Sequence, residues 1–139
     1  MKNQLLRGWV ACAAAGALLA APAAFAHHSF GYFDMSKNVL YDGVVENYTW
    51  ANPHVHILLK IPAGTPNAGN WDIEGASVNI MSRQGWNHGS LKVGDHIKVV
   101  GHPMKDGAKG ASLFFIILPD GTRRYQDIAR PKAGEALPQ

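Results

Sequence analysis

The alternation of residue types between His54 and Ile61 places the strongest constraint on how this 139-residue chain can fold. The apolar positions are Val55, Ile57, Leu59 and Ile61. Because successive side chains of a β-strand point to opposite faces, this pattern predicts a strand with one buried face. The other, outward face carries His54, His56, Leu58 and Lys60.

Short segments of similar character recur along the chain. We expect strands at 39–50, 54–61, 70–76, 96–100 and 113–118, and a last short piece at 125–128. Ser77 is expected to cap a short helix over 78–84, and Gly85 is placed to end it. The stretches 62–69 and 101–110 contain glycine and proline, which predicts loops.

This order of elements predicts the fold class. Five strands with one short helix between the third and the fourth is the order found in an OB-type barrel. The sequence therefore predicts a mainly all-β protein, a small five-stranded OB-like barrel, with a two-sheet sandwich as the competing architecture. The strand at 113–118 is apolar on both faces and needs a cover. The tail, the aromatic segment 29–38 or a second copy of the chain could provide it, so a homodimer stays open.

The start of the chain predicts export. Lys2 and Arg7 precede an apolar run over 9–25, which ends in an Ala-x-Ala site at 24–26. A basic start, an apolar run and small residues at the end are typical of a Sec-type signal peptide cleaved after Ala26. We expect residues 1–26 to be the signal peptide, 27–129 a single OB-like domain and 130–139 a flexible tail. The mature protein would be periplasmic or secreted, without stable membrane insertion; an uncleaved anchor is the alternative.

The composition after cleavage excludes several functional classes. Removal of 26 of the 139 residues leaves 113, with eleven Lys and Arg against ten Asp and Glu. This net charge near +1 lacks the basic footprint of a nucleic-acid-binding protein. The one cysteine, Cys12, lies in the leader, so the mature chain has no disulfide and no thiolate site. Neither a nucleophile elbow nor a phosphate-binding loop occurs, so we expect no enzyme.

Several sequence landmarks occur in order along the chain. They are His27-His28-Ser29-Phe30, Gly43-x-Val45, Trp50-x-Asn52-Pro53-His54, Trp71-x-x-Glu74, Arg83-x-Gly85-Trp86, Leu91-x-x-Gly94-Asp95 and Lys105-Asp106-Gly107. With them, the chain from His27 to about Tyr125 resembles a family of small secreted bacterial proteins catalogued as domain of unknown function 6152. The resemblance implies an exported, β-rich domain with no established activity, and it supplies no catalytic residue.

The histidines provide a candidate metal site. Cleavage after Ala26 would make His27 the first residue, whose amine and ring nitrogen form a two-point chelate suited to copper. His54 and His56 lie about 6.5 to 7 Å apart along one strand face and can converge on one ion. With His28 as a further candidate, the set is rich in nitrogen, as copper(II) prefers, and is similar to a histidine brace. A copper oxygenase would need a larger substrate surface.

A metal-free function stays open. Outward histidines on a strand are often ordinary surface residues, and His54 could instead hydrogen-bond across the turn formed by Asn52 and Pro53. The domain would then be an OB-like periplasmic interaction module that binds a partner protein or a small ligand. Its surface would include Trp50, Asn52 and the outward carboxylate of Glu74. In this case the N-terminus would not matter for binding.

Overall fold

The computed structural model describes residues 29–126 of the chain. Its elements are η1 (Ser29–Tyr32), β1 (Val39–Thr49), β2 (His56–Ile61), β3 (Gly69–Glu74), α2 (Val78–Arg83), β4 (His96–Pro103), β5 (Gly110–Ile117) and β6 (Arg123–Tyr125). The expected signal peptide and the tail from residue 130 lie outside the described residues, so the proposed domain boundaries stay predictions. Within residues 29–126, no helix is both long enough and apolar enough to cross a membrane.

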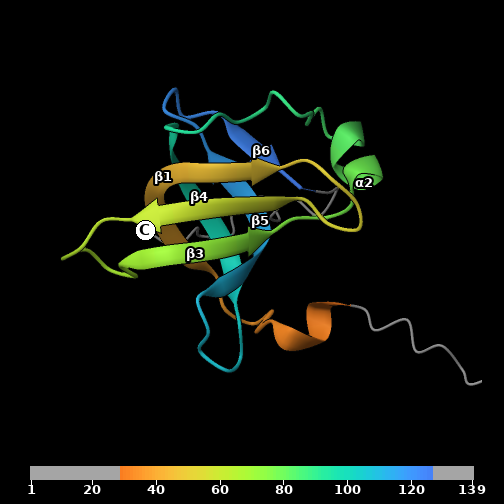
Figure 1. The fold of residues 1–139 in the computed structure, drawn as a ribbon. Coiled ribbons are helices and arrows are strands. Elements are labelled where there is room, and N and C mark those ends of the chain that lie inside the picture. Colours follow the sequence, from red (N-terminus) through yellow and green to blue (C-terminus); the bar gives the residue numbers. More distant parts are fainter. Residues whose placement is uncertain (1–28, 127–139) are drawn as a thin grey trace, which may run out of the picture.

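Five of the strands close into a barrel (Figure 1). The sheet runs in the order β3-β2-β1-β4-β5-β6, and a further parallel pairing between β3 and β5 completes the ring. In that pairing, Asp72 to Glu74 lie beside Gly110 to Ser112. Helix α2 follows β3 and precedes β4. The predicted all-β, five-stranded OB-like barrel with one short helix is confirmed, and the sandwich alternative is not observed.

The predicted inward face of β2 forms the centre of the core. Val55, Ile57, Leu59 and Ile61 are each at most 2% exposed. Burial of an aliphatic side chain of this size contributes about 1.5–3 kcal/mol relative to leaving it in water. Trp71 and Trp86 are also buried, whereas Trp50 is half-buried against the cluster. The alternation in the sequence therefore marks the inside and the outside of the barrel correctly.

Strand β1 is shared by two neighbours and bends between them. It pairs with β4 from Val39 to Val44 and with β2 from Val44 to Thr49. The register with β2 shifts between Val45 and Asn47, as expected for a bulge, which increases local twist. Gly43 lies where β1 approaches β2 closely, because a Cβ there would be 2.5 Å from the backbone oxygen of Lys60.

The prediction of a loop over residues 101–110 is wrong at both ends of this range. Strand β4 continues through Gly101 to Pro103, and β5 already begins at Gly110. The register between the two strands shifts between Val100 and Gly101, so glycine stands at an irregularity. Pro103 is the last residue of its strand. These two residues look like loop formers but lie in the hairpin of the sheet.

The cover of the apolar β5 comes from the same chain. Strand β6 pairs with its end, and the ring of Tyr125 lies 5.0 Å from that of Phe115 and 6.0 Å from that of Phe114. The guanidinium of Arg123 lies over the Phe115 ring, 5.7 Å from its centroid. The expected short piece at 125–128 is thus shifted, because the pairing residues are Arg123–Tyr125; residues 127 and 128 lie outside the described part.

Candidate functional site

The segment 29–38, here called the arm, lies against the β4–β5 hairpin. The Asp34 amide donates a hydrogen bond to the Pro103 carbonyl at 2.8 Å. Phe33 forms an isolated antiparallel bridge with Met104 and is only 5% exposed. The sequence alone does not show that the arm folds back onto this hairpin, because the bridge joins Phe33 to a residue about 70 positions later in the chain.

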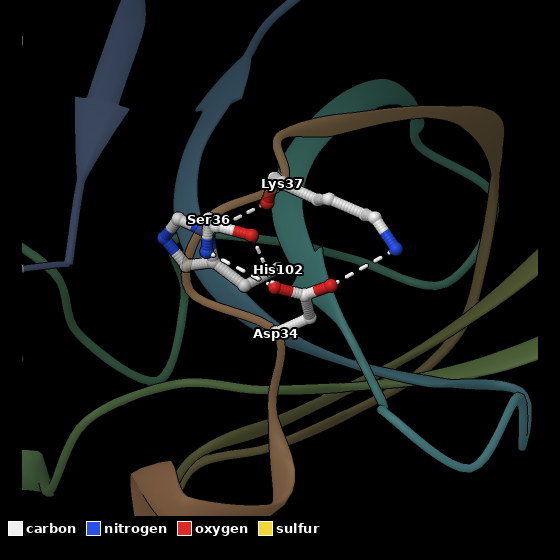
Figure 2. A network of polar contacts seen from close by, with 4 residues as sticks. All are labelled: Asp34, Ser36, Lys37 and His102. Atoms are coloured by element: carbon white, nitrogen blue, oxygen red, sulfur yellow. Dashed lines mark hydrogen bonds and ion pairs between the residues drawn. The ribbon is translucent and has the colours of Figure 1, made fainter.

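A polar cluster holds the end of the arm in place (Figure 2). The Asp34 carboxylate accepts hydrogen bonds from the Ser36 amide and hydroxyl, and it pairs with the Lys37 ammonium at 2.9 Å. These contacts lower the pKa of Asp34 to about 2. The hydrogen bond from the Ser36 hydroxyl is the largest cause, and the hydrogen bond from Lys37 is the next. His102 of β4 lies with its Nδ1 2.8 Å from the Lys37 carbonyl, which fixes this turn to the barrel.

Two histidine–carboxylate pairs lie on the outside of the barrel: His56 is the first residue of β2, His54 precedes it by two positions, and Asp72 and Glu74 belong to β3. His54 Nδ1 is 2.6 Å from Glu74 Oε1, and His56 Nδ1 is hydrogen-bonded to Asp72 Oδ1 at 2.9 Å. The two imidazoles remain 31% and 39% exposed. An ionised carboxylate can only accept, so each Nδ1 carries the proton. In a neutral imidazole this leaves Nε2, on the far side of the ring, as the acceptor.

The arm and these carboxylates border the same hollow. Its volume is about 280 Å³, and it is lined by Tyr32, Phe33, Asp72, Glu74, Met104, Ala108, Lys109 and Gly110. The hollow lies on the side of β3 opposite to β2, because Gly110 of β5 is the neighbour of Asp72 across the parallel pairing. Asp72 and Glu74 of β3 therefore contact the two histidines and also line the hollow beside the arm.

The other predicted site residues have different surroundings. Trp50 is half-buried, with its ring 6.1 Å from that of Tyr48. Asn52 Oδ1 accepts a hydrogen bond from the Val78 amide at the start of α2. His27 and His28 lie outside the described residues. The structure thus brings His54, His56 and Glu74 together and gives Asn52 a contact within the fold.

Asp72 is the partner residue that the candidate set omits. The alternation of β3 marks it as an outward residue, since Trp71 and Ile73 on either side are buried. Its partner depends on the register between β2 and β3, in which Asp72 faces Leu58 and Glu74 faces His56. Each carboxylate therefore contacts the histidine that lies two positions before its backbone partner on the neighbouring strand. The sequence alone gives no signal of this offset.

A third pair lies elsewhere on the barrel. His96 Nε2 of β4 contacts Asp42 Oδ1 of β1 at 2.8 Å, and the Lys98 ammonium lies 3.7 Å from the other oxygen. Among residues 29–126, no three or more His, Cys, Asp or Glu side chains are grouped so that they could hold a metal ion. The described barrel thus carries two imidazoles two positions apart, His54 and His56, each beside a carboxylate.

Comparisons with known proteins identify a family but no activity. No curated protein and no solved structure matches the chain. One family model matches residues 16–113, which is most of the chain and covers the barrel up to the middle of β5. The chain therefore belongs to the DUF6152 family, a family of unknown function.

Proposed function

We propose that this protein is an exported, periplasmic copper-binding protein without enzymatic activity of its own. Its ligands are the amine and ring of His27, exposed by cleavage after Ala26, and the Nε2 atoms of His54 and His56. His28 is the next candidate. The observation that carries this proposal is the pair of carboxylates behind the two strand histidines.

The carboxylates support the proposal because of what they do to the imidazoles. Metal-binding histidines almost always donate their second ring N–H to a carboxylate, a carbonyl or water, which fixes the tautomer and raises ligand basicity. Glu74 and Asp72 contact the Nδ1 atoms of His54 and His56 in this way. A neutral imidazole held in this way presents Nε2 as its acceptor, which is the arrangement that a metal ion needs.

The position of the arm supports a contribution from the N-terminus. Tyr32 lines the hollow beside Asp72 and Glu74. His27 is five positions before Tyr32 in the chain. The arm thus begins close in sequence to the proposed ligand, and its contact with the hollow supports a contribution of His27 to the site.

The donor set favours copper over other metals. An amine and three imidazoles give four nitrogen ligands, which suit the tetragonal geometry of copper(II). The mature chain contains no cysteine, so a thiolate site for zinc or an iron–sulfur cluster has no ligands. A small barrel with such a site would be suited to carrying or sequestering the ion.

A copper(II) titration with electron paramagnetic resonance tests this function. The full chain is expressed with its own leader, and mass spectrometry of the exported form establishes its first residue. We expect tight one-to-one binding with a nitrogen-rich signal, and much weaker binding when one glycine is inserted between Ala26 and His27. His96→Ala is the matched control, because its imidazole also contacts a carboxylate but lies at another site. Equal, weak binding by both forms would refute the proposal.

The hollow beside β3 supports a second, metal-free function. OB barrels bind ligands on the face of strands two and three and on adjoining loops, and this hollow is lined by β3 and by the loop between β4 and β5. A periplasmic partner protein or a small ligand could dock there and extend to Trp50. Pull-down from periplasmic extract would then depend on Trp50→Ala and be unaffected by the inserted glycine. This pattern of results, without copper binding, would favour the second function.

A further inference from the structure

We infer that the hollow beside β3 binds an organic cation: an alkylammonium group on a short apolar stem, as at the end of a lysine side chain or of a free amine. This inference rests on the second proposed function, for which it names the class of ligand, and it involves no metal ion. The residues that line the hollow lie within residues 29–126.

Two carboxylates give the hollow acceptors and negative charge. Asp72 and Glu74 line it, and each places one oxygen on a histidine. An ionised carboxylate has about four acceptor positions, so both can accept further N–H donors. A neutral imidazole does not cancel the charge of its carboxylate. An ammonium group, with three donors and a positive charge, therefore complements this part of the lining.

The lysine in the lining is directed away from these carboxylates. The Lys109 ammonium donates to the Ala68 carbonyl at 2.7 Å. It lies over Gly69, where a Cβ would collide with its Nζ. Gly69 is the first residue of β3, and Asp72 is three positions later, which is about 10 Å along a strand. The place beside the carboxylates is therefore not taken by this ammonium.

Another part of the lining is aromatic and apolar. Tyr32 is 62% exposed, whereas Phe33 is buried and bridged to Met104. The Lys105 amide donates to the Tyr32 carbonyl at 3.0 Å, and its ammonium donates to the Gly31 carbonyl at 2.9 Å, so this side is held in place by the protein itself. The face of an aromatic ring attracts a cation, and a thioether packs adaptably against an apolar stem.

The size of the hollow limits the ligand. Its volume of about 280 Å³ is near the lower end for small-molecule sites. It admits one group of the size of a lysine side chain and excludes a large cofactor. Charge, aromatic lining and size together therefore favour an alkylammonium group.

The test uses three probes of the same length: n-butylammonium, 1-butanol and butyrate. They are titrated into the exported protein with a chelator present, and backbone amide signals are followed by NMR. We expect the signals of Asp72, Glu74 and Gly110 to shift with n-butylammonium at millimolar concentration and to shift little with the alcohol or the carboxylate.

Variants locate the binding. Asp72→Asn should weaken n-butylammonium binding about tenfold, because a hydrogen bond to a charged group is lost. Asp42→Asn is the matched control, since Asp42 also contacts a histidine but lies outside this hollow, and it should change nothing. Tyr32→Leu alters an exposed position and should weaken binding about two- to fivefold. Lys109→Met should strengthen binding, because it removes a positive charge from the lining.

The outcomes separate this inference from the second proposed function. If 1-butanol shifts the same signals as strongly, the hollow binds apolar groups without recognising charge; the inference then fails and the second function stands. Equal losses in Asp72→Asn and Asp42→Asn, or no shift with any probe, also overturn the inference, and the pull-down then decides the second function by itself.

A further pair of probes distinguishes the two sources of the ammonium group. A blocked peptide with one lysine is compared with the same peptide carrying norleucine. Binding of the lysine peptide alone would identify the side chain of a partner protein as the ligand. Binding of n-butylammonium without the lysine peptide would identify a free amine, and either result supports the inference.

Discussion

Asn52 stabilises the first turn of α2 from outside the helix. Its Oδ1 accepts the Val78 amide at 3.2 Å, whereas Ser77, at the N-cap position itself, makes no side-chain cap bond. Loss of a capping side chain costs about 1 kcal/mol. We therefore expect Asn52→Ala to lower the free energy of unfolding by about that amount, and Ser77→Ala to leave it nearly unchanged. Urea denaturation of the two variants measures this, and a larger loss in Ser77→Ala would contradict the assignment.

Removal of the hydroxyl group from Tyr41 and from Tyr48 should change the stability of the protein in opposite directions. Within residues 29–126 the Tyr41 hydroxyl is buried with no hydrogen-bond partner, whereas that of Tyr48 donates to the Asn87 carbonyl at 3.1 Å. A buried unsatisfied polar group costs about 1–3 kcal/mol, and a satisfied hydrogen bond contributes about 1 kcal/mol. Tyr41→Phe is expected to stabilise the protein and Tyr48→Phe to destabilise it. Thermal unfolding of both variants measures the sign, and a loss of stability in Tyr41→Phe would contradict this view.

The same burial predicts a loss of stability in alkali. Burial raises the pKa of Tyr41 from 10.0 to about 12, and it also raises that of Tyr48. Because the unfolded chain releases these protons first, ionisation of the two tyrosines does not affect the free energy of unfolding well below pH 10 and lowers it as the pH rises toward 12. We expect the free energy of unfolding to fall over this range and to fall less steeply in Tyr41→Phe. An identical slope in wild type and variant would show that Tyr41 does not contribute.

The contact between β1 and β2 depends on a glycine. A Cβ at position 43 would lie 2.5 Å from the Lys60 carbonyl oxygen, which is backbone and cannot move aside alone. Overpacking of this kind costs about 1–3 kcal/mol. We expect Gly43→Ala to destabilise the barrel by this amount, and Gly31→Ala, where nothing lies within 4 Å, to be nearly neutral. Chemical denaturation measures both, and equal stability of the two variants would exclude a tight approach at position 43.

The elements that could be predicted are those whose own sequence carries the pattern. The segment around β2 has an apolar residue at every second position from Val55 to Ile61, and each of these residues is at most 2% exposed. Gly85 adopts φ of +83° just after α2, as expected for a glycine that ends a helix. Local signals of this kind do not depend on the partner strand. The order of the strands along the chain and the position of the helix could therefore be predicted from the sequence.

The elements that could not be predicted depend on partners far away in the chain. Strand β6 has only three residues, two of them arginine, and is a strand because β5 lies beside it. Gly101 and Pro103 indicate a loop by composition, but the arm and β5 pair with this part of β4. Tertiary pairing overrides weak local preference in such segments.

At the scale of the whole molecule, barrel closure assembles the candidate site. The parallel pairing of β3 with β5 places the arm, held by the β4–β5 hairpin, next to the strand that carries Asp72 and Glu74. The sequence identified His54, His56 and Glu74 as outward residues, but not their pairing, which depends on the register of β2 with β3. The histidine–carboxylate pairs and the folded-back arm are therefore properties of the closed fold.

The central claim is that the N-terminus and the strand histidines hold one copper ion together, and a double-mutant cycle tests it most directly. Copper(II) affinity is measured for the exported wild type, for the form with glycine inserted before His27, for His56→Ala, and for the combination. If one ion is shared, each single change should weaken binding strongly and the combination should weaken it little further. Losses that add independently, or a wild-type affinity no higher than that of the combination, would contradict a shared site.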